Sequence, residues 1–278
     1  MISAMKIGRP LKKIMKTKYA RTFIDFSIIT ILAIIVFRNW IFTNEWPAGG
    51  DVLGWVSRAY LFGKDFRWLY VWRPYSFGFT EGVNSIDFFL MLIHSVCGDA
   101  VVTVKAFVFS SFLIAGYSMF AFAYNYTHQH ISALSASMLY ILNHSLFSQF
   151  EAGHVDIIFS YALAPLLFLL LNNGLKNGKR RDILFLALGL LVFVTGFHPQ
   201  CIVIYGTFLA IFIIIYLLFP AKSSNIVMRI KHILKTCLPA AGIAFLLSSF
   251  WTVPFIFACK APYYTPEFKY SLEEPVYW

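Results

Sequence analysis

Residues 22–42 read TFIDFSIITILAIIVFRNWIF, an apolar run that follows a basic N-terminal stretch. A helix of about 20 apolar residues is long enough to cross the hydrocarbon core of a bilayer. Seven Lys and Arg residues precede the run, and no small-residue cleavage site follows it before Asn44. This combination is typical of a signal anchor and not of a cleaved signal peptide. The sequence therefore predicts that the chain enters the membrane at its N-terminus.

The rest of the chain is equally apolar. Of its 278 residues, 59% are hydrophobic and only 13% are charged, whereas soluble domains carry about 45–50% apolar and about 25% charged residues. The apolar stretches run from end to end, which excludes a secreted disulfide scaffold, a disordered chain and an ordinary cytosolic enzyme. They also lack the ten-residue alternation of an outer-membrane barrel. We therefore predict an all-α integral membrane protein.

Seven apolar segments are candidates for crossing the membrane, and together they form a predicted membrane domain over residues 22–259. The segment 183–196 is short for a crossing and needs flanking residues. The stretch 85–97 (SIDFFLMLIHSVC) is shorter still and contains Asp87 and His94. We interpret it as an interfacial or re-entrant helix, and an eighth crossing is the alternative. The seven segments are Thr22–Phe42, Val101–Tyr124, Ile131–Gln149, Val155–Asn172, Ile183–Gly196, Cys201–Phe219 and Cys237–Cys259.

Charged residues are divided between the two predicted sides of the membrane. Residues 1–21, 173–182 and 220–236 hold seven, four and four of the 23 Lys and Arg residues. Seven crossings place all three segments on one side, which the positive-inside rule makes cytoplasmic. Eleven of the 13 acidic residues fall on the opposite side. We therefore predict a multi-pass protein of the cell membrane with a cytoplasmic N-terminus and an external C-terminal segment, 260–278. The net charge of +10 then reflects orientation and not nucleic-acid binding.

The longest connection, residues 44–100, is predicted to lie outside and to carry interfacial helices. A Pro-Ala-Gly-Gly break leads to Asp51, which is placed to cap a helix over Val52–Gly63 and to hold its carboxylate at the membrane surface. Aromatic and cationic residues follow, a mixture that is common in simple interfacial anchors. The same mixture suits a sugar beside a lipid phosphate, because sugar rings stack on aromatic faces and arginine forks bind phosphate. Candidate substrate-binding residues are Arg58, Arg67, Trp72, Arg73 and, early in the second crossing, Lys105.

A second acidic loop follows the third predicted crossing. Glu151 and His154 are three residues apart, so a helical turn would place both on one face, and Asp156 follows closely. Carboxylate and imidazole side chains suit Mg, Mn or Zn, although a solvated turn that caps the next helix explains the same pattern. His198 ends the fifth crossing on the same side and is either a further ligand or an ordinary turn residue. Because both loops follow outward-going helices, we expect Asp51 and this loop to meet in one external cleft.

These features resemble the GT-C class, the polytopic membrane glycosyltransferases that use polyprenyl-phosphate-linked sugars. Within that class the chain resembles the YfhO-like and 6-pyruvoyl-tetrahydropterin-synthase-related membrane families, whose names imply no pterin chemistry here. The residues that carry the resemblance are Gly50 and Asp51 with the helix after them, Trp72–Gly78, Ser85–Gly98, and Phe150–Asp156 followed by Ala164-Pro165-Leu166.

The resemblance implies catalysis at the external face. Asp51 would act as the base on the acceptor hydroxyl or as its organiser, and the second acidic loop would help to hold a divalent metal. The implied donor is a polyprenyl-phosphate sugar within the membrane lipid. Proteins of this class commonly continue into further helices or an external domain, so the resemblance also fits a truncated chain.

Nucleotide and redox cofactors are not expected, because the sequence contains no Walker loop, GxSxG elbow, HExxH motif or dinucleotide fingerprint. Three functions stay open. The first is transfer of a sugar from polyprenyl phosphate to an external acceptor. The second is binding or transport of lipid-linked saccharides without chemistry, and the third is a helical membrane subunit or fragment. Dense outer acids and aromatics favour the first two.

Overall fold

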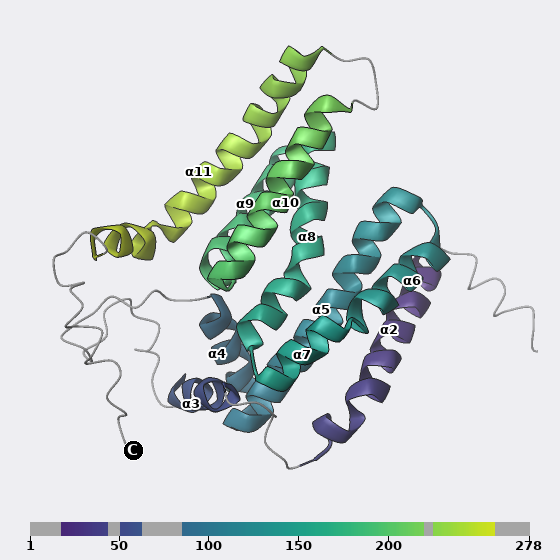
Figure 1. The fold of residues 1–278 in the computed structure, drawn as a ribbon, viewed down its shortest axis with the longest axis vertical. Coiled ribbons are helices and arrows are strands. Elements are labelled where there is room, and N and C mark those ends of the chain that lie inside the picture. The colour runs from purple at the N-terminus through teal and green to yellow at the C-terminus, as the bar shows by residue number, and fades with distance from the viewer. Residues whose placement is uncertain (1–17, 44–50, 63–84, 220–224, 259–278) are drawn as a thin grey trace, which may run out of the picture.

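The computed structural model describes residues 18–43, 51–62, 85–219 and 225–258, and within these ranges all regular secondary structure is helical (Figure 1). This confirms the predicted all-α class. The predicted site residues Arg67, Trp72 and Arg73 and the C-terminal segment lie outside the described residues. The helices are α2 (Lys18–Ile41), α3 (Val52–Phe62), α4 (Ser85–Cys97), α5 (Ala100–Thr127), α6 (His130–Ile141), α7 (His144–Ala152), α8 (Val155–Asn177), α9 (Arg180–Gly196), α10 (Pro199–Leu218) and α11 (Ile226–Ala258).

Five of the described helices, α2, α5, α8, α10 and α11, are long and apolar enough to cross a membrane. They account for five of the seven predicted crossings. The other two fall on shorter elements, which are α9 with 17 residues and the pair α6 and α7. A helix as long as α9 spans about 26 Å, somewhat less than a hydrocarbon core of about 30 Å. The structure supports a helical membrane protein, and the number seven stays a prediction.

The third predicted crossing, residues 131–149, is two helices and not one. α6 ends at Ile141 and α7 begins at His144. Between them the side chain of Asn143 accepts the N–H of Ser145 at 2.8 Å and so caps a new helix. The cap therefore divides the predicted crossing at the polar sequence Asn143-His144-Ser145.

The last predicted crossing begins earlier than the sequence indicated. We expected a basic loop over 220–236 and a helix from Cys237, but α11 already begins at Ile226. Arg229, Lys231 and Lys235 therefore lie on a helix. Lys and Arg have high helix propensities, so a group of basic residues marks the edge of the membrane and not the end of the helix.

α5 lies centrally and packs against α2, α3, α4, α6 and α8 (Figure 1). It runs alongside α8, and polar contacts join the two helices at separate levels. Ser118 Oγ donates to the Ala162 carbonyl oxygen at 2.8 Å, and Asn172 Nδ2 donates to Asn125 Oδ1 at 2.9 Å. These contacts fix the register of α5 against α8, on which the geometry of the site depends.

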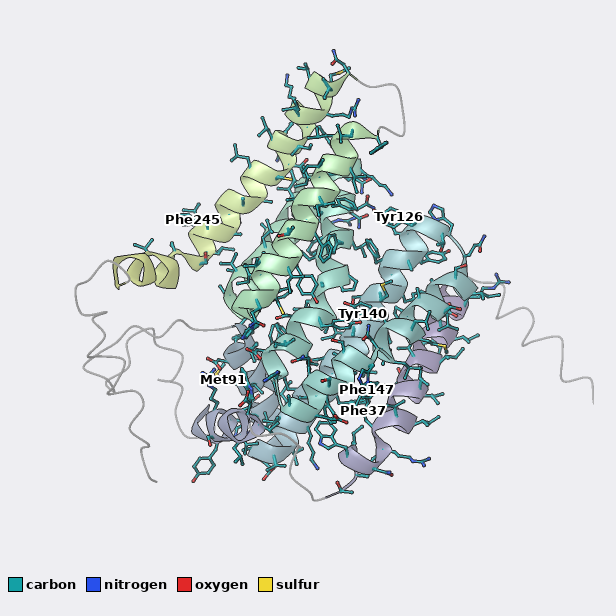
Figure 2. The ribbon with its side chains drawn as sticks, in the orientation of Figure 1. Phe37, Met91, Tyr126, Tyr140, Phe147 and Phe245 are labelled. Atoms are coloured by element: carbon teal, nitrogen blue, oxygen red, sulfur yellow. The ribbon has the colours of Figure 1, made fainter. Side chains whose placement is uncertain are left out.

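Aromatic side chains join α2 and α7 to the same core. The ring of Phe37 on α2 lies 4.2 Å from that of Phe112 on α5 and 5.8 Å from that of Phe147 on α7, centroid to centroid (Figure 2). Phe37 and Phe112 are buried. Aromatic pairs at such distances stabilise packing beyond the burial of their area.

The short helices α3 and α4 lie at the end of the bundle where α5 and α8 begin (Figure 1). α4 is joined at its start to the end of α9, because Ser85 Oγ and Thr195 Oγ1 are 2.6 Å apart. Its other end leads through Gly98 directly into α5. Both ends of α4 thus lie near the same end of the bundle, which fits its interpretation as a helix that does not cross. We call this end, which carries Asp51, the Asp51 end; it is the end predicted to face outside.

Candidate functional site

α3 presents two stripes of side chains at the Asp51 end. Each stripe recurs every third or fourth residue, as a helix of 3.6 residues per turn requires. The buried stripe consists of Val52, Val56 and Ala59. The neighbouring stripe reaches solvent and consists of Asp51 just before the helix, Trp55 and Arg58. Packing of the first stripe therefore sets a carboxylate, an indole and a guanidinium in one row, about 10 Å long by helix rise.

Asp51 contacts the loop between α7 and α8. Its Oδ2 lies 3.2 Å from His154 Nε2, and the two side chains are 65% and 38% exposed. The other ring nitrogen of His154, Nδ1, lies 2.6 Å from Gln149 Oε1. The ring is thus held between an amide and a carboxylate. Two segments that the sequence predicted to meet do so here, although the catalytic role of Asp51 and the metal role of His154 stay predictions.

Gly153 makes this contact possible. It ends α7 with a left-handed backbone (φ +83°), and it lies so close to α3 that a Cβ would be 2.7 Å from Val52 Cγ2 and 2.9 Å from the Val52 backbone nitrogen. Only glycine fits both the backbone angle and the close approach. Gly153 therefore brings the α7–α8 loop against the residue that follows Asp51.

Gly153→Ala tests this arrangement, with Gly98→Ala as its matched control. Gly98 also has a positive φ, +70°, but nothing lies within 4 Å of the position that a Cβ would take there. Both variants carry a left-handed alanine, which costs about 1–2 kcal/mol. Gly153→Ala carries in addition a clash with α3, which costs about 1–3 kcal/mol. In thermal unfolding of the purified protein we expect a clearly larger loss for Gly153→Ala, and equal losses would contradict the docking of the loop on α3.

Asp156 and His198 are linked through Ser160 on α8. The buried Ser160 Oγ donates to the Asp156 backbone oxygen at 2.7 Å and accepts the N–H of His198 at 3.1 Å. The His198 ring accepts the N–H of Gln200 at 3.3 Å and so caps α10. The Asp156 carboxylate accepts the N–H of Ile157 at 2.9 Å. Both side chains therefore have local partners, in line with the turn and capping alternatives that the sequence left open.

A metal ion is not supported by the arrangement of the described residues. Among them, no group of three or more His, Cys, Asp or Glu side chains is placed to hold one. Asp51 and His154 meet through the atoms that would bind a metal, Oδ2 and Nε2, which lie 3.2 Å apart. The predicted ligand roles of Glu151, His154, Asp156 and His198 stay predictions.

Arg58 forms an ion pair that the sequence did not indicate. Its Nη1 lies 3.3 Å from Oδ1 of Asp87 in the first turn of α4, and its guanidinium carbon lies 5.0 Å from the centre of the Trp55 ring. The side chain of Asp87 is 4% exposed and that of Arg58 is 44% exposed. In the sequence, Asp87 was only a sign that α4 does not cross the membrane. The sequence did offer a signal for Asp87 as a functional candidate, because it is a carboxylate in the first turn of an otherwise apolar helix.

Lys105, a predicted substrate-binding residue, is buried. Its Nζ donates to the Trp40 carbonyl oxygen at 3.1 Å and to the Thr43 carbonyl oxygen at 2.7 Å. These oxygens lie at the end of α2, where carbonyl groups lack intrahelical partners and a cation is favoured by the helix dipole. The described contacts of Lys105 thus join α5 to α2, and a contact with a donor phosphate stays a prediction.

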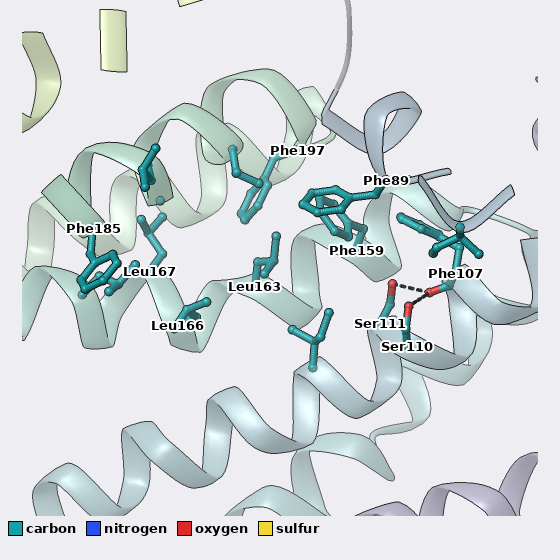
Figure 3. A pocket seen from close by; sticks show the side chains of 16 residues that line it. Phe89, Phe107, Ser110, Ser111, Phe159, Leu163, Leu166, Leu167, Phe185 and Phe197 are labelled. Atoms are coloured by element: carbon teal, nitrogen blue, oxygen red, sulfur yellow. Dashed lines mark hydrogen bonds between the residues drawn. The ribbon is translucent and has the colours of Figure 1, made fainter. Parts of the chain in front are cut away.

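A cavity of about 530 Å³ lies between α4, α5, α8 and α9 (Figure 3). Phe89, Phe159 and Phe197 gather at one end of it, and Leu167 and Phe185 lie toward the other end (Figure 3). The lining residues on α8 extend from Phe159 to Leu170, which is about 16 Å of helix. The length and apolar lining suit a hydrocarbon chain.

Two serines are the hydroxyl-bearing residues among those that line the cavity. Ser110 Oγ and Ser111 Oγ both donate to the Phe107 carbonyl oxygen, at 2.7 Å and 2.9 Å (Figure 3). Their hydroxyl groups are therefore satisfied within α5. An apolar occupant would leave neither of them without a partner.

The polar residues of the Asp51 end are close in sequence to cavity-lining aromatics. Each polar residue is one to three positions from its aromatic neighbour, so along a helix the two are at most about 5 Å apart in height. The pairs are Asp87 and Phe89, Lys105 and Phe107, Asp156 and Phe159, and His198 and Phe197. Each of these polar residues therefore lies at a height similar to that of an aromatic residue that lines the cavity.

The fold and the site thus define a helical membrane protein that has an acid–imidazole pair, Asp51 and His154, and an apolar cavity between its helices. The chain belongs to the 6-pyruvoyl-tetrahydropterin synthase related domain family of membrane proteins, whose family model matches residues 85–272. No curated protein and no solved structure matches the chain significantly. The matched range includes Asp87 and His154, whereas Asp51 and Arg58 lie before it. The match confirms one of the two predicted membrane-family resemblances, and the GT-C class stays a prediction.

Proposed function

We propose that the protein is a membrane glycosyltransferase that moves a sugar from a polyprenyl-phosphate donor to an acceptor hydroxyl at the Asp51 end. The contact between Asp51 Oδ2 and His154 Nε2, at 3.2 Å, carries this proposal. This contact positions the Asp51 carboxylate in a helix bundle that also contains a cavity suited to a lipid chain. Chemistry on a lipid-linked substrate requires both features.

Asp51 is the proposed general base. It accepts the proton of the acceptor hydroxyl while that oxygen attacks the anomeric carbon of the sugar. The bond between the anomeric carbon and the phosphate oxygen breaks, and its electron pair leaves with the polyprenyl phosphate. The carboxylate is 65% exposed, so an acceptor reaches it, and His154 and Gln149 hold its orientation. A positioned base contributes about 10²–10⁴-fold to a rate.

Charge on the leaving phosphate requires a cation nearby. Among the predicted substrate-binding residues that the structure describes, Arg58 has a half-exposed guanidinium on the same stripe of α3 as Asp51. The buried ammonium of Lys105 is directed at backbone carbonyl oxygens. Arg58 is therefore the better placed of the two for a substrate at the surface of the bundle.

The alternative is a protein that binds or transports lipid-linked saccharides without chemistry. It would use the same cavity but would leave the bond between sugar and phosphate intact. The fate of that bond separates the two functions.

The experiment uses the purified protein in liposomes that contain a polyprenyl-phosphate monosaccharide labelled in the sugar. An envelope fraction of the source cells supplies acceptors. The proposal predicts that the label moves to a product that is not a prenyl lipid, while an equal amount of polyprenyl phosphate is formed. If the donor binds but all label is recovered on it, the enzyme assignment is wrong and the binding alternative holds.

A further inference from the structure

Arg58 is an exposed cation with a buried anchor. Its Nη1 contacts Asp87, and its guanidinium lies over Trp55. A guanidinium has five N–H donors in a planar fork, so a contact through Nη1 leaves donors on its other edge. The side chain is 44% exposed, so part of it is open to a ligand from solvent.

The anchor lies on α4, a helix that also lines the apolar cavity. Asp87 is 3% exposed as a residue, and Ile86 and Leu90 beside it are fully buried, so the first turn of α4 is firmly packed. Two residues after Asp87, the ring of Phe89 lines the cavity. The start of α4 is also held against α9, because a Cβ on Gly196 would lie 2.6 Å from Ser85 Oγ. Arg58 is therefore fixed to α4, one of the helices that line the cavity.

We propose that Arg58, positioned by Asp87 and Trp55, binds the phosphate of an amphiphile whose isoprenoid chain lies in the cavity. This inference rests on the proposed function and names the residue that holds the donor head group. Arginine binds phosphate through two parallel N–H groups, a geometry that a point charge does not reproduce. Asp87 is a positioning residue, since it holds the fork and does not itself touch the phosphate.

A structural role is the competing explanation, in which Arg58 only offsets the buried charge of Asp87. The two roles differ in a double variant. Arg58→Gln takes a positive charge away from a buried carboxylate and is destabilising on either explanation. Adding Asp87→Asn removes that carboxylate charge and restores stability on either explanation. Only a phosphate-binding role predicts that binding stays impaired in the stable double variant.

The experiment measures binding to the full chain in nanodiscs of phosphatidylcholine, with farnesyl phosphate, farnesol and inorganic phosphate as probes. For the unmodified protein we expect farnesyl phosphate to bind at least tenfold more tightly than farnesol or inorganic phosphate. In Arg58→Gln and in the double variant with Asp87→Asn, we expect farnesyl phosphate to bind about 10- to 100-fold more weakly while farnesol is unchanged. Arg58→Lys should recover only part of the loss.

Three results would overturn the inference. One is a double variant that keeps the full preference for farnesyl phosphate over farnesol, which leaves Arg58 with a structural role. Another is an equal loss of farnesol binding, which indicates damage to the cavity. The third is binding of inorganic phosphate as tight as that of farnesyl phosphate, because this would indicate a site for free anions and not for a lipid. Asp51→Asn should keep the preference, so an error about the base leaves this inference standing.

Discussion

Replacing Asp51 with asparagine should lower the rate of sugar transfer by about 10²–10⁴-fold, because the variant keeps the shape of the side chain and loses its basicity. If Asp51 were only a helix cap, the change would cost about 1 kcal/mol of stability at most and would leave the rate almost unchanged. The rate is measured with saturating donor in liposomes. Near-normal turnover of Asp51→Asn would show that Asp51 is not the base.

Asp99→Asn is the matched control for this variant. Asp99 is an exposed acid at the same end of the bundle, and its side chain caps α5 by accepting the N–H of Val102 at 2.8 Å. It should lose a little thermal stability and keep its turnover. Glu151→Gln addresses the predicted metal separately. A large rate loss there that excess divalent metal reverses would place a ligand in the α7–α8 loop.

Filling the cavity should have the second largest effect. Ser110 lines it, and its hydroxyl donates to the Phe107 carbonyl oxygen of its own helix. Ser110→Trp therefore adds bulk to the cavity without breaking a hydrogen bond between helices. Excluding three or four methylene groups of a lipid chain from apolar contact costs about 3 kcal/mol, or about 100-fold in affinity. We expect farnesyl phosphate and farnesol to lose affinity equally, unlike in the Arg58 variants.

Thr207→Trp is the control for Ser110→Trp. Thr207 is exposed on α10, and its hydroxyl donates to the Val203 carbonyl oxygen of its own helix at 2.8 Å. The added Trp side chain then lies on the exposed side of α10 and not in the cavity. Farnesyl phosphate and farnesol should therefore both bind normally. Unchanged prenyl binding in Ser110→Trp would show that the chain does not occupy the cavity.

The membrane helices were predictable where charges bound a continuous apolar run. α2 was expected at Thr22–Phe42 and is found at Lys18–Ile41, so the apolar run located the helix, whose first turn contains basic residues. The break at Asn143 was not predicted. Hydropathy averages over many residues, whereas one side-chain hydrogen bond to Ser145 decides where α7 begins.

The meeting of Asp51 and His154 followed from topology, since both were expected after outward-going helices. The contact itself depends on the close approach of Gly153 to Val52, which no spacing in the sequence reveals. The partner of Arg58 was missed for a related reason. Asp87 is 29 positions away in sequence and is brought to Arg58 only by the packing of α3 on α4.

A second pair, at the opposite end of the bundle, was also missed. Asp25 on α2 contacts the ring of His130 at the start of α6, and the two residues are 105 positions apart. The sequence suggested no role for this histidine, which lies on the predicted inner side of the membrane. Long-range pairs of this kind arise from helix packing and carry no local signal.

We propose that this protein consumes a polyprenyl-phosphate sugar through Asp51. The most direct test is mass spectrometry of lipid extracts from the source cells, in which the protein is replaced by Asp51→Asn at equal abundance. We expect one polyprenyl-phosphate sugar to accumulate at least tenfold over its level in cells with the unmodified protein, while Asp99→Asn leaves that level unchanged. Identical polyprenyl-phosphate sugar pools in Asp51→Asn and unmodified cells would contradict it.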